Sequence, residues 1–323
     1  MGLKAPTNAV KRGIYAITEE LSLVVAILKD NFTAHCGNAF ACLSTRPLGS
    51  SLAFQELKGL ILKATLTITA FSYVFDIANQ AFSVEEDSVN KPTRPIPSGR
   101  LSRGGAYARW LLSWILFPAL VYFAVSLRAT SVLVLWEVWV FIFYVWPKVE
   151  YWWARNIFTA VGAILQLTLL DTLLTDTLLT HDAISHEAKT SLKWILFIWL
   201  FMTIHIQEFQ DMEGDRHAGR KTLPLVLCPK GQFWLRVATA VFIGATPVVS
   251  IALFKSCVLS SWTMLSPGLL LLALCHLLSM LTVAVRLVTL PFKEADKATY
   301  KYYYILATYL MLHMYANVQR AVC

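Results

Sequence analysis

Three carboxylates stand at helical spacing in the second half of the chain: Glu208, Asp211 and Asp215. Intervals of three and four residues place them on one face of a helix. Like charges on one stripe repel one another unless a cation neutralises them. Mg²⁺ suits such a stripe, because it takes a few carboxylate oxygens and keeps its other positions for water and phosphate. The spacing therefore predicts a magnesium site, with an ordinary solvated helix end as the alternative.

The surroundings of this stripe favour the metal site. Glu208 stands at the end of the apolar run 192–210, near the apolar boundary, where a carboxylate is costly and usually functional. Arg216 and Lys221 follow the stripe directly and could neutralise phosphate oxygens. The second half of the chain thus combines groups for a divalent cation with groups for phosphate.

A cluster in the first half of the chain repeats the arrangement. Asn79, Ser83 and Asp87 follow at intervals of four residues, so a continuous helix would carry an amide, a hydroxyl and a carboxylate on one face. Glu86 lies close to that face and could assist. Two other carboxylates point elsewhere in an ideal helix and are expected to be packed or solvated: Asp76 and Glu85.

A proline-rich segment, residues 92–97, follows the first cluster and forbids a continued helix. The resulting turn could bring Lys91, Arg94 and Arg100 back over the carboxylates. Arginine offers phosphate a planar fork of donors, and lysine offers a point charge. Anchoring of a cytosolic loop is the alternative interpretation of these cations.

The elements that must position both clusters are apolar. The chain has 323 residues, of which 57% are hydrophobic and 15% charged, which is more apolar surface than one soluble domain can bury. A membrane-spanning helix needs about 20 mostly apolar residues. We predict an all-α polytopic membrane protein, a single domain over residues 1–323, with about nine spans near 18–43, 54–78, 106–126, 128–147, 154–176, 192–210, 233–254, 262–287 and 300–319.

The basic residues are distributed by loop and indicate topology. They concentrate at the N-terminus and in alternate connections, which places loops 83–105, 211–231 and 289–299 in the cytosol and residues 177–190 on the other side. Both acidic clusters then face the cytosol. In a eukaryotic cell we expect the protein in the membrane of the endoplasmic reticulum. The net charge of +8 forms no single patch for nucleic acid, and the six cysteines show no metal spacing. Lipid is the expected surrounding, and no protein partner is implied.

Two long segments carry a resemblance to a known family. The first segment reads Asn79-x3-Ser83-x3-Asp87-x2-Asn90-Lys-Pro-x-Arg94-Pro-Ile-Pro-Ser-Gly99. The second reads Asp211-x2-Gly-Asp215-Arg-x2-Gly219-x2-Thr222-Leu-Pro224. Together they resemble the two signature motifs of the UbiA superfamily of intramembrane prenyltransferases. Tyr144-x3-Lys148 is similar to a further family segment at the diphosphate site. The resemblance implies a helical bundle around a central cavity, in which Mg²⁺ and an isoprenyl diphosphate bind and ionisation yields an allylic carbocation.

The first motif departs from the family pattern. Gln80 and Ser83 stand where prenyl-transferring members carry two aspartates. The altered motif resembles the fungal UbiA-type terpene cyclases, which close the carbocation upon itself. Aromatic residues concentrated near residues 136–153 could stabilise a moving cation or could form an interfacial belt. The resemblance to fungal diterpene cyclases favours geranylgeranyl diphosphate over farnesyl diphosphate.

These observations predict a membrane-bound, Mg²⁺-dependent terpene cyclase. The expected catalytic residues are Asn79, Asp87, Asp211 and Asp215; the expected metal ligands are Glu86, Asp87, Glu208, Asp211 and Asp215; the expected diphosphate-binding residues are Lys91, Arg94, Tyr144, Lys148, Arg216 and Lys221. Prenyl transfer to an aromatic acceptor is the alternative reaction, and an ion-coupled transporter the alternative class. His205 could orient a carboxylate or accept a final proton, although packing is the usual role of such a histidine, as it is for His276.

Overall fold

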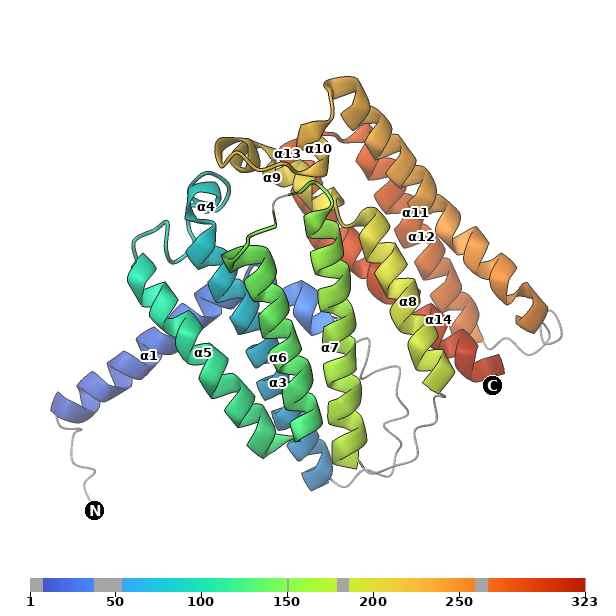
Figure 1. Cartoon of the computed structure of the whole chain (residues 1–323). Coiled ribbons are helices and arrows are strands. Elements are labelled where there is room, and N and C mark those ends of the chain that lie inside the picture. Colours follow the sequence, from blue (N-terminus) through green and yellow to red (C-terminus); the bar gives the residue numbers. More distant parts are fainter. Residues whose placement is uncertain (1–7, 38–53, 150, 179–185, 259–266, 323) are drawn as a thin grey trace, which may run out of the picture.

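The computed structural model describes residues 8–37, 54–149, 151–178, 186–258 and 267–322, and these residues form helices and connecting turns without a β-strand (Figure 1). The α-helices are α1 (Asn8–Leu28), α3 (Phe54–Phe82), α4 (Val84–Asn90), α5 (Arg103–Ala124), α6 (Leu127–Val140), α7 (Ala154–Leu178), α8 (His186–Thr203), α9 (Ile206–His217), α10 (Leu223–Val226), α11 (Pro229–Val258), α12 (Pro267–Thr289), α13 (Lys293–Ala298) and α14 (Ile305–Val322). Phe141–Val145 and Thr299–Tyr304 are π-helical. The all-α prediction is confirmed.

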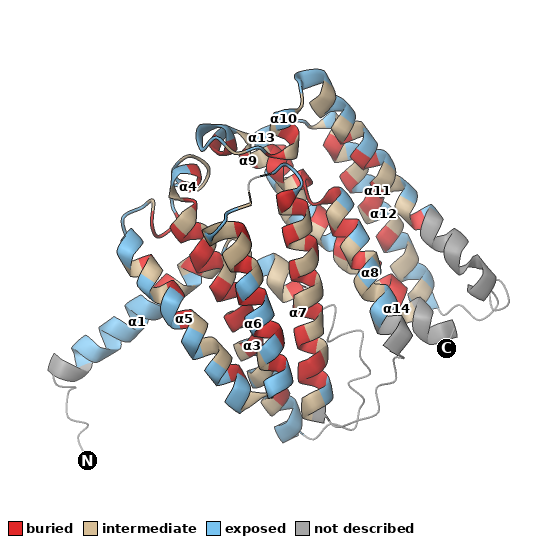
Figure 2. Ribbon diagram, viewed as in Figure 1, coloured by how far each residue is buried: buried red, intermediate tan, exposed pale blue. Residues whose placement is uncertain are grey.

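The bundle has two apolar cores, and both α3 and α7 contribute to each. One core joins these two helices to α8, α11, α12 and α14, and the other joins them to α1, α5 and α6. Ala160 and Leu167 of α7 face the first core, whereas Ala154 and Leu169 face the second. Buried residues accordingly run along most of α7, while α5 and α12 expose a broad face (Figure 2). A helix that is apolar on all sides belongs inside such a bundle.

Five helices in the described part of the chain are long and apolar enough to cross a membrane: α3, α5, α6 with its π-helical end, α7 and α12. The bent pair of α8 and α9 would make a sixth. The run at residues 18–43 is interrupted by a turn at residues 29–31, and its residues 38–43 lie outside the described part. The chain is a multi-pass membrane protein, and the count of nine spans stays a prediction.

Both motifs lie on short helices that follow a bend. α9 leaves the axis of α8 at 45° after a break at residues 204–205, and α4 follows α3 after Ser83. α4, α9, α10 and α13 gather at the same end of the bundle (Figure 1). The loops that we expect in the cytosol therefore lie together at one end.

The expectation of a continuous helix through the first cluster is wrong. Ser83 has φ −128° and ψ 33° and separates α3 from α4, so Asn79 and Asp87 do not share a helical face. Serine is a favoured residue at a helix N-terminus. Here its hydroxyl group does not cap α4 but accepts a hydrogen bond from Arg220 Nη2 at 2.6 Å. A contact with the second motif therefore holds the side chain at the break.

Candidate active site

The three carboxylates of the second motif lie on α9 as the spacing predicted, and all three are buried. Arg155, at the start of α7, faces two of them: its Nε lies 3.9 Å from Glu208 Oε1, and its Nη2 lies 3.7 Å from Asp215 Oδ1. Glu208 Oε2 also accepts a hydrogen bond from the backbone N–H of Leu223. Yet Glu208 Oε1 and both oxygens of Asp215 are buried without a hydrogen bond from any described residue. Burying a carboxylate oxygen without a hydrogen bond lowers the stability of the fold unless a cation compensates its charge.

The first motif places Glu86 against the same cations. Glu86 is buried, forms an ion pair with Arg220 Nη1, and lies 4.0 Å from Arg155 Nη2. Burial alone would raise the pKa of Glu86, but the attraction of Arg220 and Arg155 outweighs it and holds that pKa below its ordinary value. Arg220 Nη1 is also 3.5 Å from Asp215 Oδ1. Two guanidinium groups thus stand between the carboxylates of the two motifs.

Asp87 and Arg94 are bound to each other. Arg94 Nη1 donates to both oxygens of Asp87 at 2.8 Å, and Arg94 Nε donates to Asp30 Oδ2 at 2.8 Å. Both Asp87 and Arg94 are 1% exposed. This triad ties the turn after α1 to α4 and to the proline-rich loop. Removing one partner of a buried ion pair leaves an uncompensated buried charge, so breaking such a pair strongly destabilises the fold.

Asn90 joins the two motif helices directly. Its Nδ2 donates to the backbone oxygen of Asp211 at 2.9 Å, and its Oδ1 accepts from the backbone N–H of Gly214 at 3.1 Å. A Cβ atom on Gly214 would overlap the Asn90 side chain. The glycine between Asp211 and Asp215 is therefore required by the close approach of α4 to α9.

Replacing Gly214 with Ala is expected to destabilise the protein by about 1–3 kcal/mol and to slow turnover, because the methyl group displaces Asn90 and breaks both hydrogen bonds. Thermal unfolding in detergent and diphosphate release would measure the two effects. Gly59→Ala is the matched control, since a Cβ atom there meets nothing within 4 Å. Equal melting temperatures for the two variants would contradict this reading of Asn90.

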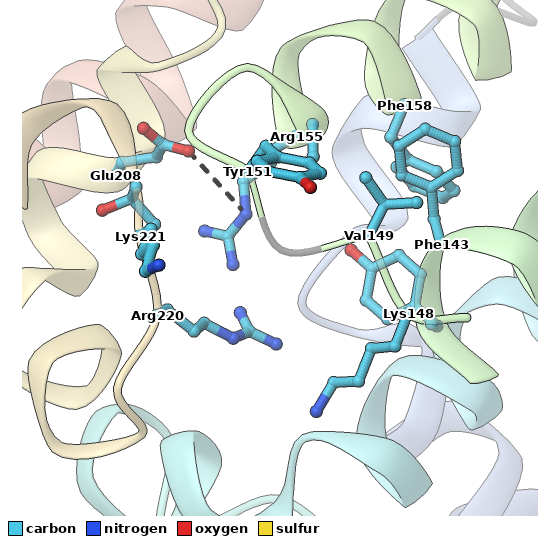
Figure 3. A pocket seen from close by; sticks show the side chains of 12 residues that line it. Phe143, Lys148, Val149, Tyr151, Arg155, Phe158, Glu208, Arg220 and Lys221 are labelled. Carbon is cyan, nitrogen blue, oxygen red and sulfur yellow. Dashed lines mark ion pairs between the residues drawn. The ribbon is translucent and has the colours of Figure 1, made fainter. Parts of the chain in front are cut away.

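A cavity of ≈ 70 Å³ opens beside these carboxylates, and we call it the polar cavity because five charged side chains of the described residues line it among aromatic and aliphatic ones. Four cationic residues line it, together with Glu208 and Tyr144: Lys148, Arg155, Arg220 and Lys221. Figure 3 shows the charged ends of Lys148, Arg155 and Arg220 turned towards the same space. Lys148 has φ 62°, a left-handed conformation that is uncommon outside glycine and that concentrates at functional sites. Such a cluster of cations suits an anion of high charge density.

A larger apolar cavity of ≈ 130 Å³ adjoins the polar one. Tyr144, Arg155 and Phe158 line both. Eight of the described residues that line the larger cavity are Phe, Trp or Tyr. The rings of Phe71 and Trp136 stack with centroids 4.4 Å apart, and Phe158 lies 5.3 Å from Trp136. One binding region thus has a cationic end and an aromatic end.

The predicted site residues separate into two groups. Tyr144, Lys148, Glu208 and Lys221 line the polar cavity, and Glu86 and Asp215 are linked to it through Arg155 and Arg220. Asp211 pairs with Lys91, whose Nζ is 3.9 Å from Asp211 Oδ2, and neither of these two side chains lines a cavity. Four others line neither cavity: Asn79 is half-buried in α3, Asp87 and Arg94 pair with each other, and Arg216 is exposed. Their expected roles would require these side chains to turn towards the cavity.

Other expectations from the sequence meet different outcomes. Glu85 is exposed and pairs with Arg103, while Asp76 is fully buried and accepts from Asn31 Nδ2, in agreement with solvated and packing roles. Arg100 does not reach the carboxylates. Its guanidinium contacts Ser22 and Glu19 of α1 instead. His205 is buried with Nε2 at 2.8 Å from Thr239 Oγ1 and lines neither cavity, and His276 is buried within α12.

Sequence reasoning missed Arg155, Arg220 and Asp30. Arg155 stands at the first turn of an apolar run, where a cation reads as an anchor of the positive-inside kind. The carboxylates that face Arg155 come from segments 53 to 69 residues away in sequence. A signal was nevertheless present for Arg220, since it lies within the second motif between Gly219 and Lys221.

The two altered positions of the first motif bind protein groups. Gln80 Nε2 donates to the backbone oxygen of Ile27 at 2.9 Å, and Ser83 Oγ accepts from Arg220. Gln80 thereby holds the end of α1 against α3. Neither position carries a carboxylate that could bind Mg²⁺.

The donor set fits Mg²⁺ bound together with a phosphate. Within the described residues, no group of three or more His, Cys, Asp and Glu side chains is close enough to hold a metal ion by itself. Mg²⁺ does not need such a cage, because it commonly binds through one or two carboxylates, water and substrate phosphate. The buried oxygens of Glu208 and Asp215 that accept no hydrogen bond could supply those carboxylate ligands.

Comparison with known proteins agrees with this geometry. The model of the UbiA prenyltransferase family matches residues 40–312. The chain is 30% identical over 169 residues to the diterpene cyclase eriG of Hericium erinaceus, which covers 51% of each chain. It is 28% identical over 193 residues to the polyprenyl transferase eriF of the same fungus, covering 57% of this chain and 64% of that one. The matches thus span about half to two thirds of these relatives.

Solved structures share the fold. A UbiA homolog from Archaeoglobus fulgidus aligns with a TM-score of 0.56 and 14% identity, over 93% of this chain and 98% of that one. A structure of a UbiA homolog from the same organism bound to GPP and Mg²⁺ aligns with a TM-score of 0.50 and 14% identity, over 86% of this chain and 99% of that one. At this identity the likeness concerns the fold alone.

Proposed function

Because the chain belongs to the UbiA prenyltransferase family, we propose that it is an Mg²⁺-dependent terpene cyclase acting on isoprenyl diphosphates, as its similarity to a diterpene cyclase supports. It ionises a linear isoprenyl diphosphate and closes the carbocation into rings. The observation that carries the proposal is the pair of adjoining cavities, one cationic and one aromatic, which share Tyr144, Arg155 and Phe158. A diphosphate with an apolar tail has the same division of charge.

The cationic end binds the leaving group. Lys148, Arg155, Arg220 and Lys221 line it and would neutralise the diphosphate as its bond to carbon breaks. Glu208 and Asp215 would hold Mg²⁺ together with the diphosphate, with Glu86 and Asp211 beside them, and the metal would further stabilise leaving-group charge. The buried pair of Asp87 and Arg94 would keep α4 and the following turn in place. Tyr144 would orient the diphosphate from the boundary between the cavities.

The aromatic end governs the fate of the carbocation. Phe71, Phe75, Trp136 and Phe158 present ring faces and edges to a cavity from which the apolar tail would exclude water. A carbocation held there survives long enough to react with the double bonds of the same isoprenyl group. The similarity to the diterpene cyclase of Hericium erinaceus supports this outcome and favours a C20 substrate.

Prenyl transfer to an aromatic acceptor is the second candidate. The similarity to the polyprenyl transferase of the same fungus favours it. The apolar cavity also contains amide groups, from Asn31, Gln166 and Gln207, that could bind a polar acceptor. The two reactions share ionisation and differ only in what captures the cation.

Membranes containing the protein, incubated with geranylgeranyl or farnesyl diphosphate and no acceptor, are expected to release diphosphate and an equal amount of cyclic hydrocarbon. Gas chromatography with mass spectrometry would identify the product. Excess chelator is expected to stop both, and added Mg²⁺ to restore them. Diphosphate release that begins only after an aromatic acceptor is added would establish the second candidate instead. Undiminished turnover in chelator would exclude the metal assignment.

A further inference from the structure

A short helical segment, residues 32–37, forms one wall of the apolar cavity. Three elements hold it in place. Gln166 of α7 donates from Nε2 to the backbone oxygen of His35 at 3.0 Å. The hydroxyl of Tyr309, in α14, donates to the backbone oxygen of Thr33. Gly37 has no room for a Cβ atom, which would overlap the Tyr309 ring. The segment is thus fixed from both halves of the bundle.

The imidazole of His35 lies against the aromatic wall. Its centroid is 6.0 Å from the ring of Phe71 and 6.3 Å from that of Phe75, in edge-to-face geometry. Phe71 in turn stacks on Trp136. A carbocation stabilised by these rings therefore lies within a few ångströms of the imidazole.

Among the described residues that line this cavity, His35 is the one with a side chain that is a usable proton acceptor near neutral pH. The described part of the lining contains no carboxylate and no lysine. The guanidinium of Arg155 is always protonated, the amides are not basic, and the tyrosines carry phenols with an ordinary pKa near 10. Apolar surroundings favour the neutral form of an imidazole, which is the form that accepts a proton.

We propose that His35 is the base that ends the cyclisation, an inference that rests on the proposed function. In this step a C–H bond next to the cationic carbon breaks, its electron pair forms a carbon–carbon double bond, and the proton moves to a ring nitrogen of His35. The imidazolium later passes the proton to the diphosphate that the ionisation released. The position of His35 relative to the aromatic rings then decides which double-bond isomer leaves the enzyme.

The competing base is the released diphosphate itself. It would lie at the cationic end of the region, near Arg155 and Arg220, whereas His35 lies at the aromatic wall. The two bases remove protons from different carbons of the same cation. Product identity therefore distinguishes them, whereas the rate of ionisation does not.

The test compares the wild type with His35→Gln and His35→Phe, using membranes supplied with geranylgeranyl diphosphate and no acceptor. We expect diphosphate release within about threefold of the wild type, while the share of the wild-type hydrocarbon falls at least tenfold in favour of double-bond isomers or alcohols. Assays in H₂¹⁸O would identify alcohols formed by water capture. His276→Gln is the matched control, because His276 is buried in α12 and lines neither cavity.

Product shares are ratios within one variant, so they remain readable if a variant folds in low yield. An unchanged product share in both His35 variants would overturn the proposal, and so would a parallel loss of diphosphate release and product with no change in shares. A changed share in His276→Gln as large as that in His35→Gln would also overturn it. Failure of the wild type to form any cyclic hydrocarbon would instead contradict the proposed function.

Discussion

Asp215→Asn is expected to reduce diphosphate release by roughly a hundredfold or more, because it removes a charge from the centre of the site without changing its shape. Asp215 is 0% exposed and lies between two cations, with Arg220 Nη1 at 3.5 Å and Arg155 Nη2 at 3.7 Å. Neither carboxylate oxygen accepts a hydrogen bond from the described residues. An amide cannot hold Mg²⁺ with comparable strength, nor can it balance both guanidinium groups.

The matched control for this variant is Glu213→Gln on the same helix. Glu213 is exposed and pairs with Lys293 at the surface, where water and salt weaken such a contact. Both variants should migrate as folded protein in size-exclusion chromatography, and only Asp215→Asn should lose diphosphate release. Near-wild-type release from folded Asp215→Asn would exclude Asp215 as a metal ligand.

The sequence predicted the fold class and the pairing of two motifs because both depend on local patterns. Long apolar runs indicate membrane helices whatever their neighbours are. Glu208, Asp211 and Asp215 share α9 because their spacing fits a single uninterrupted helix. Patterns of this kind require no knowledge of which helices pack together.

The features that sequence reasoning missed depend on contacts between distant residues. The helix break at Ser83 coincides with a hydrogen bond from Arg220, 137 residues away. The burial of Arg94 depends on Asp30, which no motif includes. Arg155 resembles an ordinary anchoring cation until α7 is placed beside α4 and α9. Helix periodicity assigns a residue to a face, but it does not reveal what that face meets.

These contacts change the reason for a prediction about Ser83. In an unbroken helix, a carboxylate at position 83 would act mainly by repelling Asp87 on the same face. In the structure, position 83 faces Arg220, which also pairs with Glu86 and approaches Asp215. A carboxylate at this position would instead compete for that cation. Charge-assisted pairs of arginine with carboxylate are about twice as strong as neutral hydrogen bonds.

Ser83→Asp is therefore expected to lower the rate of hydrocarbon formation at least tenfold. The new carboxylate would draw Arg220 away from Glu86 and from the cavity, where it is needed to neutralise diphosphate. Ser83→Asn is the matched control, because it has the same shape without the charge. If the charge causes the loss, Ser83→Asn should retain several times more activity than Ser83→Asp, measured as hydrocarbon and diphosphate formed from geranylgeranyl diphosphate.

Two results would contradict this account, and each has a definite meaning. Equal losses in Ser83→Asp and Ser83→Asn would show that the hydroxyl contact with Arg220, rather than the competition for its charge, is what matters at this position. Unchanged hydrocarbon at an undiminished rate from Ser83→Asp would show that the site tolerates the carboxylate found in prenyl-transferring members. Transfer of the prenyl group to an added aromatic acceptor by that variant would go further, because the residue at position 83 would then help to decide between cyclisation and transfer.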